Sequence, residues 1–228
     1  MIQFLKTMIY LSAQPDELYF LWQIKLLVFN FKRINIRREN IHILIAYSKE
    51  YGLNPLVREY IMQNQDALYF TYEDTRVKKE YPSSIRPHII YKHFEENPFL
   101  EKETIFYHDS DILLKEKLDK LHLLQGEVWY ASSTKGYTGI DCIIRTFGEA
   151  VFERMCKLIN VDREKIEGNA LNAGGAQYIL KHVKSSFWKK MEEDCELVYS
   201  YLLTFAHTDY PFNDTPNNAK TQAWYTDM

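Results

Sequence analysis

The sequence lacks an apolar run long enough to cross a membrane. Its longest apolar region, residues 18–31, is interrupted by Gln23 and Lys25, whereas a spanning helix needs about 20 predominantly apolar residues. The N-terminus also lacks a cationic segment followed by an apolar run and a small-residue cleavage site, so no signal peptide is expected. These absences predict a chain with no membrane span and a cytoplasmic location.

The sequence also has few cysteines and no excess of positive charge. Its three cysteines, Cys142, Cys156 and Cys195, are widely spaced and fit neither a zinc-binding pattern nor a disulfide framework. We therefore expect free thiols in a reducing compartment. A net charge of −3 gives no basic stripe of the kind that binds phosphate backbones, so nucleic acid is not an expected partner.

The length and composition favour one folded α/β domain. The chain has 228 residues, of which 46% are hydrophobic and 15% aromatic, and this content argues against disorder. Strand-like segments in the first half cover residues 8–12, 41–47, 67–72 and 104–107. Helix-like segments between them cover residues 18–34, 54–63 and 83–96, the first opened by Pro15 and Asp16. Alternation of this kind predicts a mostly parallel central sheet with helices on both faces.

The second half has a less regular pattern. Residues 127–132 resemble a strand, and residues 147–158 and 185–205 have helical spacing. Residues 170–175 include paired glycines and precede an apolar stretch at residues 176–180. We predict no structure beyond His207.

An acidic pair follows the fourth strand-like segment. Asp109 and Asp111 flank Ser110 at the point where a strand gives way to a loop, and ligands of parallel sheets sit outside the carboxyl ends of the strands. Two carboxylates at this spacing can bind one Mg²⁺ or Mn²⁺ ion, since both cations prefer oxygen ligands. The alternative is that Asp109 caps the turn and Asp111 is simply solvated.

The order of these segments resembles a known enzyme family. The helix, strand and DxD series from Ser84-Ile85-Arg86-Pro87 to Asp109-Ser110-Asp111 is similar to the GT-A fold nucleotide-diphospho-sugar glycosyltransferases. Within them it most resembles the glycogenin-like and galactosyltransferase-like enzymes of family 8, and it also resembles the hydroxyproline arabinosyltransferases. Asn172-Ala173-Gly174 resembles the Asn-(Ala/Ser)-Gly segment that follows the DxD motif in family 8.

The resemblance implies a fold, an activity and a cofactor. It implies a GT-A-like single domain over residues 1–228, with a nucleotide-sugar-binding half at residues 1–114 and an acceptor-binding half at residues 115–228. The implied activity is metal-dependent transfer of a sugar from a nucleotide-diphosphate donor, with a UDP-sugar favoured, to an unidentified acceptor hydroxyl. The implied cofactor is Mn²⁺ or Mg²⁺, held by Asp109 and Asp111.

The resemblance also implies residues that contact the nucleotide and its phosphates. The loop after the first strand would contact the base and ribose through Ser12, Ala13 and Gln14, although these residues can equally form a plain strand-to-helix turn. Arg86 and Lys92, on the helix before the acidic pair, would reach the donor phosphates. Arginine suits bidentate phosphate contact and lysine acts as a point charge, whereas the alternative is a solvated helix face.

Further positions would lie close to the donor sugar. Asn172, Gly174 and Gly175 would line it, and Ser110 would lie among the donor-binding residues. Adjacent glycines permit close approach of the backbone to a ligand, or form a tight turn. The chain has only eight glycines, so their paired use here indicates a constrained site.

The third metal ligand and the catalytic base are implied less directly. Family 8 enzymes supply a histidine near the C-terminal end, for which His207 is the positional candidate, although the usual glycine and lysine neighbours are absent. The family's downstream Asp-Gln pair is absent as well. Asp141 is the candidate base that an inverting enzyme needs, ahead of Asp209 and Asp214. An exposed loop histidine and ordinary turn aspartates are the alternatives, and the pattern does not choose between inversion and retention.

Two other functions fit parts of the pattern. Phosphatases of the haloacid dehalogenase type also place Asp-X-Asp after a strand, with the first aspartate as nucleophile. Their motif usually follows the first strand and continues with Thr or Val, whereas here Ile112 follows Asp111. A non-catalytic nucleotide- or sugar-binding domain is the second alternative, and it would not need a divalent metal.

Overall fold

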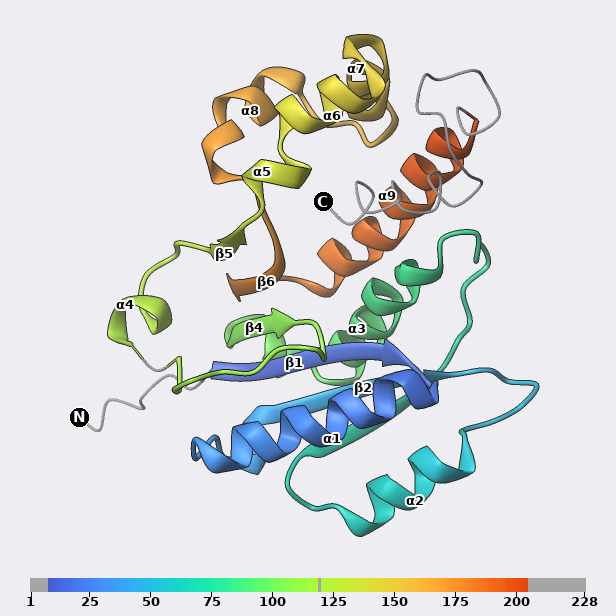
Figure 1. Cartoon of the computed structure of the whole chain (residues 1–228), viewed down its shortest axis with the longest axis vertical. Helices are drawn as coiled ribbons and strands as arrows, with labels where there is room; N and C mark the ends of the chain where they lie inside the picture. The colour runs from blue at the N-terminus through green and yellow to red at the C-terminus, as the bar shows by residue number, and fades with distance from the viewer. Residues whose placement is uncertain (1–7, 119, 205–228) are drawn as a thin grey trace. The chain divides into compact units, whose positions relative to one another are not determined.

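The computed structural model describes residues 8–118 and 120–204, and it contains a six-stranded sheet in the order β3-β2-β1-β4-β6-β5 (Figure 1). The chain forms two compact units. The first unit holds residues up to Arg76 together with residues 85–131 and 176–189, and the second holds residues 77–84, 132–175 and those from Lys190 onward. The predicted functional halves, divided at residue 114, cut across both units.

The sheet is mostly parallel, as predicted. Four strands run parallel to one another: β1 (Met8–Pro15), β2 (Ile41–Tyr47), β3 (Leu68–Glu73) and β4 (Thr104–His108). The strand β6 (Gly174–Lys181) pairs antiparallel with β4, and β5 (Tyr130–Ser133) follows it at the edge. The carboxyl ends of β1 to β4 therefore meet at one edge of the sheet.

Helices pack on both faces of this sheet, which confirms the predicted α/β class. The helix α1 (Leu18–Arg33) buries Leu27 and Phe31 in one apolar cluster with Tyr10 of β1 and Ile43 of β2. The helix α3 (Ile85–Glu96) packs on β1, β2 and β3 through the other face, where His93 contacts the ring of His42. Side chains at positions 42 and 43 of one strand point to opposite faces, so the two helices lie on opposite sides.

The remaining helices are short except for the last. In the first unit these are α2 (Pro55–Gln63), α4 (Leu121–Leu124) and the 3-10 turns η1 (Arg38–Asn40) and η3 (Pro98–Lys102). The second unit contains η2 (Pro82–Ser84), α5 (Lys135–Thr138), α6 (Ile140–Phe147), α7 (Glu149–Leu158), α8 (Arg163–Gly168) and η4 (Ala170–Asn172). The long helix α9 (Ser185–Leu203) begins in the first unit and continues in the second. None of the helices that the structure describes combines the length and apolar content needed to cross a bilayer.

Several boundaries differ from the sequence-based expectation. Pro15 does not open a helix but ends β1, and Asp16 accepts a hydrogen bond from the backbone N–H of Asn54 instead. The helix expected at residues 147–158 is α7, which begins at Glu149, and the preceding helix α6 was not predicted; Gly148 separates the two with a φ of 90°, a conformation that favours glycine. The expected free cysteines are confirmed: all three are unpaired and buried.

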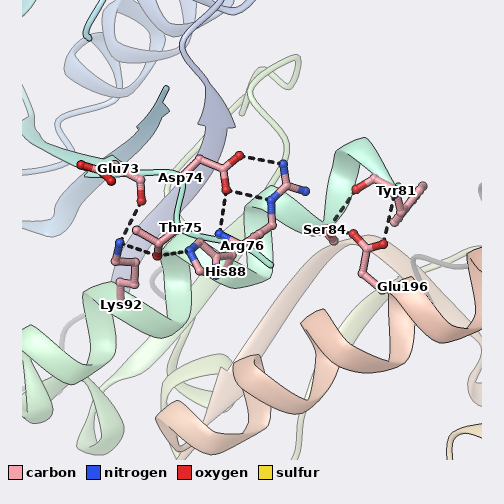
Figure 2. Close-up of polar contacts among 9 residues, drawn as sticks. All are labelled: Glu73, Asp74, Thr75, Arg76, Tyr81, Ser84, His88, Lys92 and Glu196. Atoms are coloured by element: carbon pink, nitrogen blue, oxygen red, sulfur yellow. Dashed lines mark hydrogen bonds and ion pairs between the residues drawn. The ribbon is translucent and has the colours of Figure 1, made fainter. Parts of the chain in front are cut away.

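A buried carboxylate orders the segment just before α3. Glu196 of α9 is almost fully enclosed, and its two oxygens accept hydrogen bonds from the backbone N–H of Tyr81 and from the hydroxyl of Ser84 (Figure 2). The Ser84 hydroxyl therefore lies within hydrogen-bond distance of both a Glu196 carboxylate oxygen and the Tyr81 carbonyl, and shares its single proton between them. This segment leads directly into Ile85, the first residue of α3.

Two buried histidines bridge the sheet and α3. Nδ1 of His42 lies 2.9 Å from Nε2 of His93, and Nδ1 of His93 lies 2.8 Å from the hydroxyl of Tyr72. Burial lowers the pKa of His42 to about 4, and burial together with the neighbouring His42 lowers the pKa of His93 to about 3. Both rings are thus neutral in the folded chain near neutral pH.

This pair predicts a loss of stability in mild acid. Unfolded histidine has a pKa of about 6.5, so between about pH 6.5 and pH 4 only the unfolded chain takes up protons at these positions, and each ring costs roughly 1.4 kcal/mol of unfolding free energy per pH unit. His42→Gln keeps a polar partner for His93 and removes one titrating ring. Urea unfolding across this pH window should give a shallower pH dependence for His42→Gln by about that amount, and an unchanged slope would contradict the assignment.

Candidate functional site

The acidic pair lies at the carboxyl edge of the sheet, beside the start of α3. Asp109 directly follows the last residue of β4, and Arg86 is the second residue of α3. Nη1 of Arg86 lies 2.9 Å from Oδ1 of Asp109, and the two side chains are 25% and 27% exposed. The structure therefore joins two of the residues that the sequence predicted for this site.

The charges on this edge oppose one another. Burial raises the pKa of Asp109, the Arg86 guanidinium lowers it, and the negative charge of Asp111 raises it again. The two carboxylates are therefore near enough to interact, and Asp111 is exposed. A divalent cation would relieve repulsion between like charges, but an exposed Asp111 also fits a solvated side chain, so cation binding stays a prediction.

Ser110 points the other way, into the protein. Its hydroxyl donates a 2.6 Å hydrogen bond to Oε1 of Gln23, and both side chains are buried. Farther along the loop, Asn30 donates to the carbonyl of Leu114 at 3.0 Å and accepts from its N–H at 2.9 Å. Two buried polar side chains of α1 thus fix the loop, and Ser110 is its anchor in this structure; its predicted role near the donor stays a prediction.

His108 is the last residue of β4 and directly precedes the acidic pair. It is fully buried beside the rings of Phe31 and Phe106, and its Nδ1 lies 2.8 Å from the carbonyl of Asp109. Burial lowers the pKa of His108 to about 4, so the ring is neutral and Nδ1–H donates to that carbonyl. Its Nε2 has no hydrogen-bond partner among the described residues.

Lys92 lies farther along α3 and stabilises the end of β3. Its Nζ donates to the carbonyl of Glu73 at 2.8 Å and to the hydroxyl of Thr75 at 3.1 Å (Figure 2). In the same loop, Arg76 makes a bidentate contact to Asp74, with Nε at 3.0 Å from Oδ1 and Nη2 at 3.1 Å from Oδ2. Lys92 therefore lies at the carboxyl edge of the sheet, where it donates hydrogen bonds to the end of β3 and the loop after it. Its contact with a phosphate stays a prediction.

The residues predicted to contact the base lie within β1 and not in a loop. Ser12, Ala13 and Gln14 are all buried, because β1 extends to Pro15. The Ser12 hydroxyl donates to Oε1 of Gln14, and the Gln14 amide donates to the carbonyl of Leu44. The expected loop is corrected to a strand, and Asp16 is the first residue beyond it.

The candidates of the second unit lie on separate elements. Asp141 is exposed in the first turn of α6, and Asn172 is exposed at the end of η4. Gly174 and Gly175 begin β6 and do not form a turn, and a Cβ at position 175 would lie 2.8 Å from Cγ2 of Thr134. Gly175 is therefore required for packing within its own unit. His207, Asp209 and Asp214 lie outside the described residues.

Among the described residues, the predicted metal ligands are Asp109 and Asp111. No three His, Cys, Asp or Glu side chains gather there into a potential metal cluster. A pair of carboxylates suits Mg²⁺ or Mn²⁺, which commonly retain waters and bind substrate phosphates in their remaining positions. The donor set therefore fits such a cation bound together with its ligand.

Sequence reasoning missed three polar groups at this edge. Asp16 has a buried Oδ1 without a partner among the described residues, and burial raises its pKa. The Asp74–Arg76 pair and the His108 ring were also missed. Each stands one to three residues beyond or at the end of a parallel strand, and that position was the available signal.

The loop anchor gives a testable prediction. Asn30→Ala removes both hydrogen bonds to the Leu114 backbone, so it should lower the unfolding free energy by roughly 1–3 kcal/mol. Asn30→Asp keeps the acceptor for the Leu114 N–H but buries a carboxylate against the Leu114 carbonyl, so at neutral pH its loss should equal or exceed that of Asn30→Ala. Chemical denaturation measures both variants, and wild-type stability in Asn30→Ala would refute the anchoring role.

Comparisons with known proteins returned similar structures but no similar sequences. No protein-family model matches the chain, and no curated protein is significantly similar to it in sequence. Similar solved structures include the bifunctional glycosyltransferase WbbM (12% identity, TM-score 0.49, 99% of this chain and 38% of that one). GlyE of Streptococcus pneumoniae TIGR4 is another (11% identity, TM-score 0.38, 96% and 42%). A third is the mannosyltransferase PcManGT of Pyrobaculum calidifontis, in complex with GDP-Man and Mn²⁺ (12% identity, TM-score 0.41, 98% and 70%). The chain spans less than half the length of the first two.

Proposed function

We propose that this chain is a metal-dependent glycosyltransferase that uses a nucleotide-diphosphate sugar as its donor. One observation carries the proposal: Asp109 and Asp111 interact at the carboxyl edge of a mostly parallel sheet while Arg86 of α3 contacts Asp109. Ligands of such sheets bind at this edge. The GT-A resemblance of the sequence supports the same reaction class.

The charges of these three side chains suit a metal-bound diphosphate. Two carboxylates and one guanidinium leave one negative charge in excess, which attracts a divalent cation. Once that cation is bound, the excess becomes positive and attracts a diphosphate. The metal would neutralise the charge that develops on the leaving nucleoside diphosphate.

Arg86 has a role of its own in this arrangement. A guanidinium carries five N–H donors in a planar fork and binds carboxylate and phosphate oxygens bidentately. From its place in the first turn of α3, beside Asp109, Arg86 holds that carboxylate and contacts a donor phosphate. Lys92 adds positive charge farther along the same helix.

The other predicted residues complete the proposal. Ser12, Ala13 and Gln14 are buried in β1 and act by positioning the end of that strand, and Ser110 fixes the loop that carries the acidic pair. The family resemblance also assigns Asn172, Gly174 and Gly175 to the donor sugar, His207 to the metal and Asp141 to the base, and these assignments stay predictions. A UDP-sugar is the favoured donor.

Donor hydrolysis tests the proposal. Without acceptor, the chain should release free sugar slowly from at least one of UDP-glucose, UDP-galactose and GDP-mannose, in the presence of Mn²⁺ and not of EDTA; GDP-mannose belongs in the panel because PcManGT is complexed with it. Asp111→Asn should lower the rate by about a hundredfold or more, since it removes a metal ligand and its charge.

Asp66→Asn is the matched control for that measurement. Asp66 is an aspartate paired with Lys32 just before β3, at the opposite edge of the sheet, and its replacement should leave hydrolysis unchanged. Release of phosphate from a phosphomonoester, with no sugar release, would replace the transferase by a phosphatase. Tight metal-independent nucleotide-sugar binding without turnover would indicate a binding domain.

Arg86 is tested by binding. Arg86→Ala should weaken the binding of UDP with Mn²⁺ by roughly 1.5–3 kcal/mol, the scale of a charge-assisted hydrogen bond, and Arg86→Lys should recover part of the loss. Because Arg86 lowers the pKa of Asp109, its loss also favours protonation of that carboxylate. Calorimetry at pH 8 disfavours protonation of Asp109 and so reduces this second effect, and equal affinities of the two proteins there would remove Arg86 from the site.

A further inference from the structure

The outer face of α1 has an unusual composition. Its inner face buries Leu21, Leu27 and Phe31 in the main core. Five large apolar side chains nevertheless point outward and are between 43% and 65% exposed: Leu18, Tyr19, Trp22, Leu26 and Phe29. They recur at helical spacing, so they form one continuous stripe, here called the α1 outer stripe. Exposed apolar surface gathered in this way marks an interaction site more often than scattered residues do.

The charged residues from Leu18 to Arg38 all have one sign. Lys25, Lys32 and Arg33 are exposed on the same side of α1, and Arg37 and Arg38 follow directly after it. Residues 18–38 contain these five basic residues and no Asp or Glu, in a chain whose net charge is −3. Two of them have acidic neighbours from outside the helix face, in the surface pairs Lys32–Asp66 and Arg37–Glu39. Such exposed pairs are weak and exchange readily with other anions.

The stripe is accessible within the described part of the chain. In Figure 1, α1 lies in front of β2, and no described element covers its outer side. Contacts from outside the helix reach two of its lysines: Nζ of Lys25 lies 5.3 Å from the ring centroid of Tyr60 on α2, and Nζ of Lys32 lies 2.9 Å from Oδ2 of Asp66. A partner can therefore approach along the length of the helix.

We propose that α1 docks this chain on an anionic lipid surface. A helix that places Trp, Tyr, Phe and Leu on one side and only Lys and Arg as charges matches helices that lie in the membrane interface. Tryptophan and tyrosine favour the headgroup level, and each basic residue near an anionic surface adds to binding. The helix lies on the membrane and does not span it.

Charge decides against a second copy of the chain as the occupant. In a two-fold dimer the same patch meets itself, so the basic residues of one α1 would face those of the other. The helix offers no acidic residue to pair with them. An anionic bilayer supplies both the apolar interior and the countercharge that the stripe requires.

Vesicle sedimentation of the full chain tests this proposal. The chain should bind vesicles of phosphatidylcholine with 30% phosphatidylglycerol at least tenfold more tightly than pure phosphatidylcholine, and 1 M NaCl should weaken that binding. The double variant Trp22→Glu/Phe29→Glu should lose binding by at least about tenfold. Lys25→Gln/Arg33→Gln should lose roughly tenfold or more on anionic vesicles only, at about 1 kcal/mol for each basic residue.

A matched control separates the stripe from a general charge effect. Val77→Glu/Leu121→Glu makes the same change in charge at two exposed apolar residues outside α1 and should bind like the wild type. Near-UV circular dichroism should show that every variant folds, since all the altered side chains are exposed. The proposal is overturned if the wild-type chain does not bind anionic vesicles. It is also overturned if the control variant loses as much vesicle binding as Trp22→Glu/Phe29→Glu. A dimer that dissociates in Trp22→Glu/Phe29→Glu, without vesicle binding, would also overturn it in favour of a self-interface.

Discussion

Two like charges held together at the end of β4 are the constraint around which this edge of the sheet is organised. Asp109 and Asp111 repel one another, and burial of Asp109 adds to the cost of keeping both ionised. The surrounding structure offsets this cost in two ways: Arg86 neutralises part of the charge, and α1 holds the loop so that it cannot relax outward. The carboxylates of Asp109 and Asp111 both stay accessible at this edge as a result.

The loop is held by a simple alternation of directions. Ser110 turns inward to Gln23, Asp111 turns outward, and Ile112 and Leu114 pack on the core beneath α1. The acidic side chains thus reach solvent because their neighbours are anchored. The two hydrogen bonds between Asn30 and Leu114 satisfy the backbone N–H and carbonyl of a loop residue that lies beyond β4.

The sequence was sufficient for the sheet and for the position of the acidic pair, because both depend on local pattern. Apolar runs alternating with helical spacing located the parallel strands, and strand order placed Asp109 and Asp111 at the ligand edge. Contacts between residues distant in sequence could not be predicted from local pattern. The Gln23–Ser110 hydrogen bond and the antiparallel pairing of β6 depend on tertiary packing. Pro15 was misread because proline both opens helices and ends strands, and the break at Gly148 needed a backbone angle that no periodicity reveals.

The helix α1 shows how one element can serve several constraints without conflict. Its apolar inner side stabilises the sheet, and two amides on that side, Gln23 and Asn30, fix the loop that carries the acidic pair. Neither task uses the outer side, where selection for solubility alone would favour mixed charges. That side instead carries five large apolar residues, and the charged residues of the helix are all cations. Because the outer side chains touch neither the core nor the loop, a change there alters surface affinity and leaves the acidic pair in place.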